Sequence, residues 1–124
     1  MSDFLRQFGQ DLKANVSGYI AVAVTEVKSG ISYYSDSVLP SFDPELASAY
    51  NLEVVKAKLK AIDALKLNQS IDSIMITLTG QIHIIDISDD KRYFIYMAVD
   101  STKSNLGMVK ALLNKYKNDI TGKL

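Results

Sequence analysis

The stretch of sequence that decides the fold reads DPELASAYNLEVVKAKLKAIDALKL over residues 43–67. It opens with a strong helix start, because the Asp43 side chain can accept hydrogen bonds from the free amides of the first turn. Pro44 adds a fixed φ at a position where a missing N–H is no loss. The sequence therefore predicts a long helix in the middle of the chain, from this start to about Leu67.

This middle helix has two apolar stripes, whereas a helix that lies on a sheet needs only one. At roughly 100° per residue, polar positions such as Lys58 and Glu53 separate the two stripes. We expect the alanine-rich stripe to lie on the sheet, since small side chains allow a close approach. That stripe contains Leu46, Ala47, Tyr50, Val54, Ala57, Ala61, Ala64 and Leu65, and the second contains Leu52, Val55, Leu59 and Ile62.

The second stripe is then left facing away from the sheet and needs another surface. Each of its four branched side chains is worth about 1.5–3 kcal/mol if it is removed from water. A contiguous exposed patch of this kind is typical of an interface. We therefore predict that the second stripe packs against another copy of the chain. The alternative interpretation is that a terminal helix of the same chain covers it, or that its residues are half-exposed.

Strand patterns flank the middle helix on both sides. The first strand is apolar on both alternating sets, which is typical of a strand covered on both faces. A short turn at residues 28–30 leads to a weakly alternating strand, which we expect at an edge of the sheet. Three further strands follow the helix, separated by turns at Gly80 and at residues 89–91. The five predicted strands span residues 18–27, 31–35, 71–79, 81–88 and 92–100.

A helix with one apolar stripe is predicted at each end of the chain. The first spans residues 2–15, with Ser2 as its candidate cap, and the last spans about 105–120. The order of elements is therefore helix, two strands, helix, three strands, helix. At 124 residues the chain has the length of one domain, so we expect residues 1–124 to form a single domain.

The composition excludes several classes of function. Lysine plus arginine and aspartate plus glutamate both number 14, so no net charge attracts nucleic acid or a membrane surface. Cysteine is absent, which removes disulfides, thiolate chemistry and the commonest zinc sites. The N-terminus lacks a secretory signal pattern, and no run approaches the roughly 18 apolar residues of a membrane span. We expect a cytoplasmic protein that neither binds nucleic acid nor inserts into a membrane.

No convergent set of catalytic residues is evident in the sequence. The only histidine, His83, lies in a strand where Asp86 falls on the opposite face, so a structural role is favoured. The acidic residues Asp86, Asp89 and Asp90 lack the spacing of a calcium loop and are interpreted as a solvated turn. Gly80 belongs to a hairpin turn with no following helix to bind phosphate. We therefore expect no enzyme and no catalytic, cofactor-binding or metal-binding residues.

At this point the chain resembles the roadblock/dynein light-chain family, in the arrangement of its bacterial members. The resemblance implies an α+β fold of roadblock, or profilin-like, architecture in a single domain over residues 1–124. In that fold a five-stranded antiparallel sheet carries one long helix on one face and two terminal helices on the other. The matching segments are Val16-Ser17-Gly18, Lys28-Ser29-Gly30, residues 42–47, residues 74–78, residues 81–85 and Asn105-Leu106-Gly107.

The resemblance also implies that two copies pair through the middle helix and an adjacent edge strand. The strand at residues 71–79 suits this role, since it contains no proline or lysine to discourage pairing. The predicted dimer-interface residues are Leu52, Val55, Leu59, Ile62, Ile74, Met75 and Ile76.

Family members are scaffolds and regulators, and bacterial ones often act with a small Ras-like GTPase in polarity or motility. The implied function is thus a non-catalytic homodimeric scaffold or regulator of signalling, with a GTPase as a candidate partner. A direct part in GTP hydrolysis is not expected, because Arg6 and Arg92 are the only arginines and neither is predicted in a loop made for insertion. The alternative is a small-ligand sensor, which requires a closed apolar pocket of at least about 300 Å³.

Overall fold

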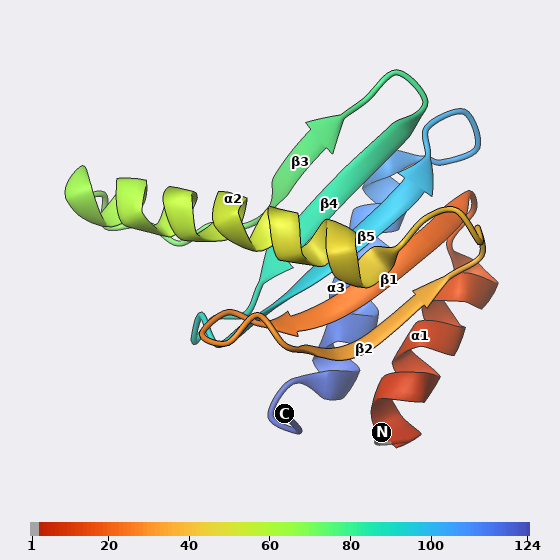
Figure 1. Ribbon diagram of the computed structural model, residues 1–124, viewed down its shortest axis with the longest axis horizontal. Coiled ribbons are helices and arrows are strands. Elements are labelled where there is room, and N and C mark those ends of the chain that lie inside the picture. The colour runs from red at the N-terminus through yellow and green to blue at the C-terminus, as the bar shows by residue number, and fades with distance from the viewer. Residues whose placement is uncertain (1–2) are drawn as a thin grey trace.

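The elements follow one another in the predicted order (Figure 1). The computed structural model describes residues 3–124, so Ser2, the expected cap of the first helix, lies outside the described residues. The middle helix ends about one turn before Leu67, where Lys66 takes a left-handed conformation with φ of 56°. The elements are α1 (Asp3–Asn15), β1 (Tyr19–Glu26), β2 (Ser32–Ser37), α2 (Pro44–Ala64), β3 (Ile74–Thr77), β4 (Gln81–Ile87), β5 (Tyr93–Asp100) and α3 (Leu106–Ile120).

The five strands form one antiparallel sheet in the order β2-β1-β5-β4-β3. The central strands β1 and β5 are buried on both faces, as their uninterrupted apolar runs predicted. β2 lies at one edge, as expected, and β3 lies at the other. β3 is much shorter than the predicted strand, because residues 71–73 leave the ladder with β4. There the Asp72 carboxylate accepts a hydrogen bond of 3.1 Å from Lys110 Nζ of α3.

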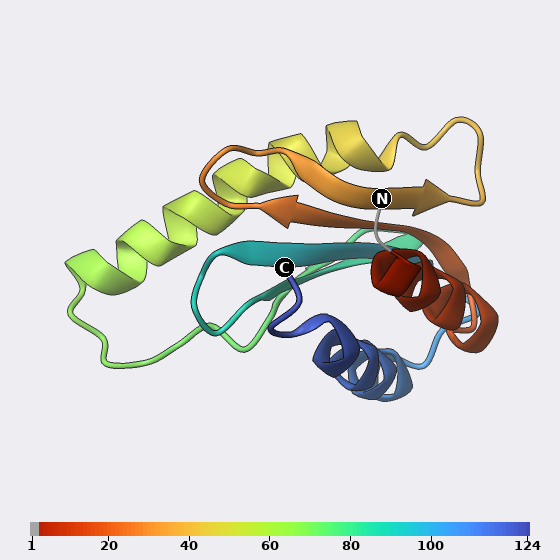
Figure 2. The ribbon, with the colours of Figure 1, turned by 90° about the horizontal axis from the view of Figure 1, so that it is seen from below.

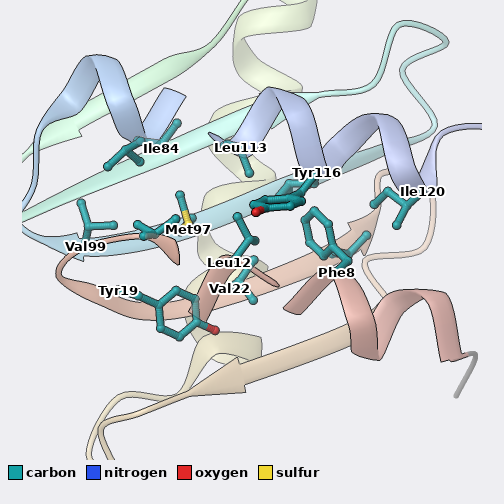
Figure 3. Packing of buried hydrophobic residues seen from close by; sticks show 14 of the residues in the cluster. Phe8, Leu12, Tyr19, Val22, Ile84, Met97, Val99, Leu113, Tyr116 and Ile120 are labelled. Atoms are coloured by element: carbon teal, nitrogen blue, oxygen red, sulfur yellow. The ribbon is translucent and has the colours of Figure 1, made fainter. Parts of the chain in front are cut away.

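The sheet is covered by α2 on one face and by α1 and α3 on the other, which confirms the expected layers (Figure 2). Phe8 and Leu12 of α1 meet Leu113 and Tyr116 of α3 above the sheet, and all four lie in one buried cluster (Figure 3). The core on the α2 face consists of Ile20, Ala21, Leu52, Val55, Ile85, Ile87, Phe94, Tyr96 and Ala98.

The start of α2 is fixed by the residues that the sequence singled out. The Asp43 carboxylate accepts hydrogen bonds from the backbone amides of Glu45 and Leu46, at 3.0 and 3.1 Å. One turn further on, the hydroxyl of Ser48 is hydrogen-bonded to that of Thr25 in β1, and both side chains are fully buried. The N-terminal half of α2 is therefore attached to the sheet by a cap and by a buried polar contact.

The prediction of which stripe of α2 faces the sheet is wrong. Leu52 and Val55 are buried in the core on the α2 face, and the alanine-rich stripe faces solvent. The physical reason lies in the sheet, where the paired residues Ala21 and Ala98 supply the small side chains beneath the helix. The helix therefore supplies large side chains to this interface. Most of the alanine-rich stripe lies toward solvent, although Ala47 still packs against the core.

Candidate self-association surface

The C-terminal turns of α2 extend past the sheet on the side of β3 (Figures 1 and 2). The helix packs mainly on β1 and β2, so its last turns have little sheet beneath them. Leu59 and Ile62 are on the sheet-facing side of this overhang, yet both remain half-exposed. Together with Leu67 and Ile71 they line an open cavity of about 290 Å³. The overhang therefore leaves apolar surface uncovered beside the edge of the sheet.

The edge strand β3 presents unpaired backbone groups to solvent. Ile76 is opposite His83 and Leu78 N–H donates to Gln81 O, so the alternate residues Met75 and Thr77 direct their N–H and C=O away from β4. The Met75 side chain is 41% exposed on the α3 side, whereas Ile74 packs toward the α2 side. Residues 74–79 contain no charged residue or proline that would protect the edge.

The outward stripe of α2 is a second apolar surface without cover in the described chain. Its large members Leu46, Tyr50 and Leu65 are 55%, 72% and 68% exposed. Between them lie small side chains such as Ala57 and Ala61, which allow another helix to approach closely. The overhang, the β3 edge and the outer stripe are three apolar surfaces that the described chain leaves exposed, and we call them together the β3–α2 surface.

The structure distributes the predicted interface residues over three environments. Leu52 and Val55 lie beneath α2 against their own sheet and do not reach the free surface. Leu59 and Ile62 lie at the overhang, and Ile74, Met75 and Ile76 lie in β3. Sequence reasoning assigned Leu46, Tyr50 and Leu65 to the sheet and so missed them as surface residues. The presence of two stripes was the correct signal, but nothing in the helix alone told the stripes apart.

His83 is held as a neutral ring on the α2 face of β4. Its Nε2 lies 2.8 Å from Gln81 Oε1, and its Nδ1 lies 3.1 Å from the hydroxyl of Tyr96. Burial lowers the pKa of His83 and raises the pKa of Tyr96 above its usual range. No carboxylate is in contact with this ring among residues 3–124, so the arrangement offers no proton relay.

Asp86 lies on the opposite face of β4, as the odd spacing from His83 predicted. Its carboxylate accepts a hydrogen bond of 3.0 Å from Lys117 Nζ of α3, and each side chain is only 13% exposed. Burial raises the pKa of Asp86, and Lys117 opposes this shift. This ion pair connects α3 to the sheet and is satisfied within the chain.

The described chain has an open cavity of about the volume that a ligand sensor requires. The cavity beside the ion pair holds about 310 Å³, but it is an open indentation lined by polar side chains such as Asp72, Asp89 and Asn114.

Residues 3–124 contain no group of three or more acidic, histidine or cysteine side chains that could hold a metal ion. Their helices are also too short or too polar to span a bilayer.

The two arginines differ in their surroundings. Arg6 lies in α1, as expected for a residue outside any loop. Arg92 instead lies in the turn between β4 and β5, where its side chain is exposed and its guanidinium is 3.9 Å from the Asp90 carboxylate. The sequence placed Arg92 at the start of the strand at residues 92–100, whereas the structure places it in the turn, one residue before β5.

The fold is similar to that of several solved structures. Myxococcus xanthus MglB superposes with a TM-score of 0.80 at 15% identity, and the match covers 98% of this chain and 94% of MglB. A Roadblock/LC7 domain from Streptomyces avermitilis gives a TM-score of 0.79 at 6% identity and 92% coverage of each chain. The gliding protein mglB from Thermus thermophilus gives 0.75 at 12% identity, with 97% of this chain and 90% of that chain covered.

Comparisons of the sequence itself give no match, either to a family model or to a curated protein. At identities this low the structural likeness establishes the fold. It covers nearly the whole described chain and includes the order of the strands and the placement of the three helices. The chain therefore has the roadblock fold, as the resemblance in its sequence implied.

Proposed function

We propose that the chain is a single roadblock-type domain that works as a non-catalytic, homodimeric scaffold for partner proteins. The observation that carries this proposal is the overhang of α2 beside the unpaired edge of β3. A helix that extends past its own sheet leaves Leu59 and Ile62 half-exposed, and an apolar edge strand leaves hydrogen-bonding groups without partners. The half-exposed apolar side chains and the unpaired backbone groups lie on the same side of the molecule.

Pairing of β3 with β3 of another copy covers these apolar side chains and supplies partners for the unpaired backbone groups. In antiparallel register across a two-fold axis, the outward groups of Met75 and Thr77 find partners in the second copy. The partner's sheet then continues beneath the overhang and covers Leu59 and Ile62. The outer stripe of α2, with Ala57 and Ala61, is placed to meet the same stripe of the second helix.

We further propose that the dimer is cytoplasmic, of bacterial type, and regulates a small Ras-like GTPase in polarity, motility or signalling. Support comes from the fold shared with MglB and from the Thermus thermophilus neighbour, which is a gliding protein. The dimer acts by binding and positioning its partner, since the described residues bring no catalytic set together. A pull-down that recovers no protein partner, from an organism that carries the gene, would contradict this part of the proposal.

Self-association is tested by matched proline substitutions at the two edges of the sheet. Thr77→Pro removes an outward N–H of β3 without removing a bond to β4, and Ser35→Pro makes the same change in β2, whose residue 35 also points away from its neighbour. Sedimentation at micromolar concentration should give a dimer for the natural chain and for Ser35→Pro, and a monomer for Thr77→Pro. A natural chain that stays monomeric overturns the proposal.

A further inference from the structure

His83 lies where the segment that enters α2 crosses the sheet. Its ring makes an edge-to-face contact with Phe42, with ring centroids 6.1 Å apart, and a second with Tyr96 at 5.3 Å. Phe42 directly precedes Asp43, the residue that caps α2. Any change in the charge of the ring therefore acts on the residue from which α2 begins.

The hydrogen bonds around His83 are complete only when the ring is neutral. The carboxamide oxygen of Gln81 can only accept, so Nε2 carries the hydrogen and donates to it at 2.8 Å. Nδ1 is then an acceptor and receives the hydroxyl hydrogen of Tyr96 at 3.1 Å. Tyr96 is fully buried, so water does not offer its hydroxyl an alternative acceptor.

Protonation of the ring places a second hydrogen between Nδ1 and the Tyr96 oxygen. The Tyr96 hydroxyl then has to accept from Nδ1, and its own hydrogen loses the acceptor that it has when the ring is neutral. A buried hydroxyl without an acceptor is destabilising. Breaking the contact between His83 and Tyr96 relieves this conflict, and it also removes the surface on which Phe42 rests.

The surroundings of His83 contain no carboxylate in contact with the ring, although the ring is half-exposed and Gln81 Oε1 accepts from Nε2–H in either protonation state. Tyr96 is the one titratable side chain in contact with it among residues 3–124, while Phe42 and the cross-strand neighbour Ile76 are uncharged. The nearby Asp43 carboxylate is engaged by the amides of α2. The chain has one histidine and no cysteine, so His83 is the one side chain whose ordinary pKa lies near neutral pH.

We infer that His83 is an acid-sensitive clasp, which holds the start of α2 on the sheet when neutral and releases it when protonated. The clasp acts on the end of α2 that lies away from the β3 edge. It therefore does not depend on the proposed pairing of two copies, and either idea can fail without the other. A signalling protein with such a clasp changes the order of the segment at residues 38–46 when its surroundings become acidic.

The single histidine makes a direct test feasible by NMR, because its ring gives one resonance to follow from about pH 8 to about pH 5. We expect the ring to titrate below the ordinary midpoint of about 6.5, with the backbone amides of Phe42, Asp43, Glu45 and Leu46 shifting at the same midpoint. In Tyr96→Phe, Nδ1 of the neutral ring loses the hydroxyl that donates to it. Protonation of the ring then leaves no buried hydroxyl without an acceptor. The midpoint should therefore move up, and the amide shifts should become smaller.

Two further variants keep the inference falsifiable. His83→Asn retains an acceptor for Tyr96 but carries no ionisable ring, so the amides of Phe42, Asp43, Glu45 and Leu46 should stop titrating in this range. Tyr34→Phe, a change to a half-buried tyrosine on the opposite face of the sheet, should leave the midpoint unchanged. Circular dichroism checks that each variant is folded, and if Tyr96→Phe is not, His83→Asn alone decides. A ring that titrates at or above about 6.5, or amides that do not follow it, overturns the inference.

Discussion

The hydroxyls of Thr25 and Ser48 are hydrogen-bonded to each other at a fully buried position between β1 and α2. A second contact of 3.2 Å joins Thr25 Oγ1 to the hydroxyl of Ser32 in β2, so the threonine bridges two strands and the helix. Polar groups buried in this way have to find partners within the protein. The pair therefore fixes the position of α2 along β1, which apolar packing alone leaves less well defined.

Removing one hydroxyl of this pair should destabilise the protein more than removing both. Thr25→Val leaves the Ser48 hydroxyl without its partner, and we expect a loss of about 1–3 kcal/mol in the free energy of unfolding. The double variant Thr25→Val/Ser48→Ala should recover part of this loss, because it leaves no fully buried hydroxyl without a partner; Ser32, which also contacts Thr25, is only half-buried. Urea unfolding of the two single variants and the double variant measures the coupling. Strictly additive losses would show that the two hydroxyls act independently.

Gly9 permits a close contact between α1 and β2. A methyl group built at this position would lie 2.0 Å from the Tyr34 hydroxyl oxygen, so Gly9→Ala should destabilise the fold by about 1 kcal/mol or more despite the better helix propensity of alanine. Gly107→Ala in α3 is the matched control, since its nearest neighbour would lie 3.5 Å away. That change should stabilise the protein by about 0.5–1 kcal/mol in thermal unfolding. Equal effects at both glycines would contradict the contact.

The buried carboxyl of Asp86 should give a characteristic dependence of stability on pH. Its pKa is raised, so the native state binds this proton more readily than the unfolded state does. The contribution of Asp86 is therefore largest below its ordinary value of about 3.8 and is lost as the pH rises through the pKa of the folded state. Acidification from about pH 6 to about pH 4 should shift the difference in unfolding free energy between the natural chain and Asp86→Asn in favour of the natural chain. A shift in the opposite direction would show that Lys117, and not burial, dominates.

The outer stripe of α2 allows a test of assembly that spares the fold. Leu65 is largely exposed, so Leu65→Asp should change the stability of the monomer by no more than about 0.5 kcal/mol. In the proposed dimer the same change places a charge in an apolar contact and should weaken self-association about tenfold or more. Lys60→Asp, also at an exposed position of α2, is the control. Leu59→Asp is less informative, because Leu59 also packs against the core. Unchanged sedimentation of Leu65→Asp would remove the outer stripe from the interface.

Local signals in the sequence predicted most of the fold. The cap at Asp43, the uninterrupted apolar runs of β1 and β5, and the weak alternation of β2 are properties of single segments, and each appears in the structure as predicted. Which apolar stripe of α2 packs on the sheet could not be predicted in the same way, because it depends on which side chains the sheet presents. Ala21 and Ala98 are 77 positions apart in the chain, and their pairing beneath the helix is a property of the tertiary fold.

The sequence predicted that α2 would leave an apolar surface free, but it did not predict which residues form that surface. Two apolar stripes on one helix indicated that one of them would be free, whichever faced the sheet. The length of β3 was a different kind of error. Of residues 71–73 only Ile71 is apolar, and in the structure the Asp72 carboxylate accepts a hydrogen bond from Lys110 of α3.

The two free edges of the sheet also decide how large an assembly this chain can build. If β3 of one copy paired with β2 of the next, every addition would leave a fresh edge of each kind, and the copies would grow into a fibre. Pairing of β3 with β3 uses up the same edge in both copies and stops at two. The register shift opposite Val24 and Thr25 bends β2, and Asp36 places a carboxylate in that strand, which makes it a poor template for growth. If the chain pairs through β3 as proposed, the asymmetry between the edges disfavours polymerisation.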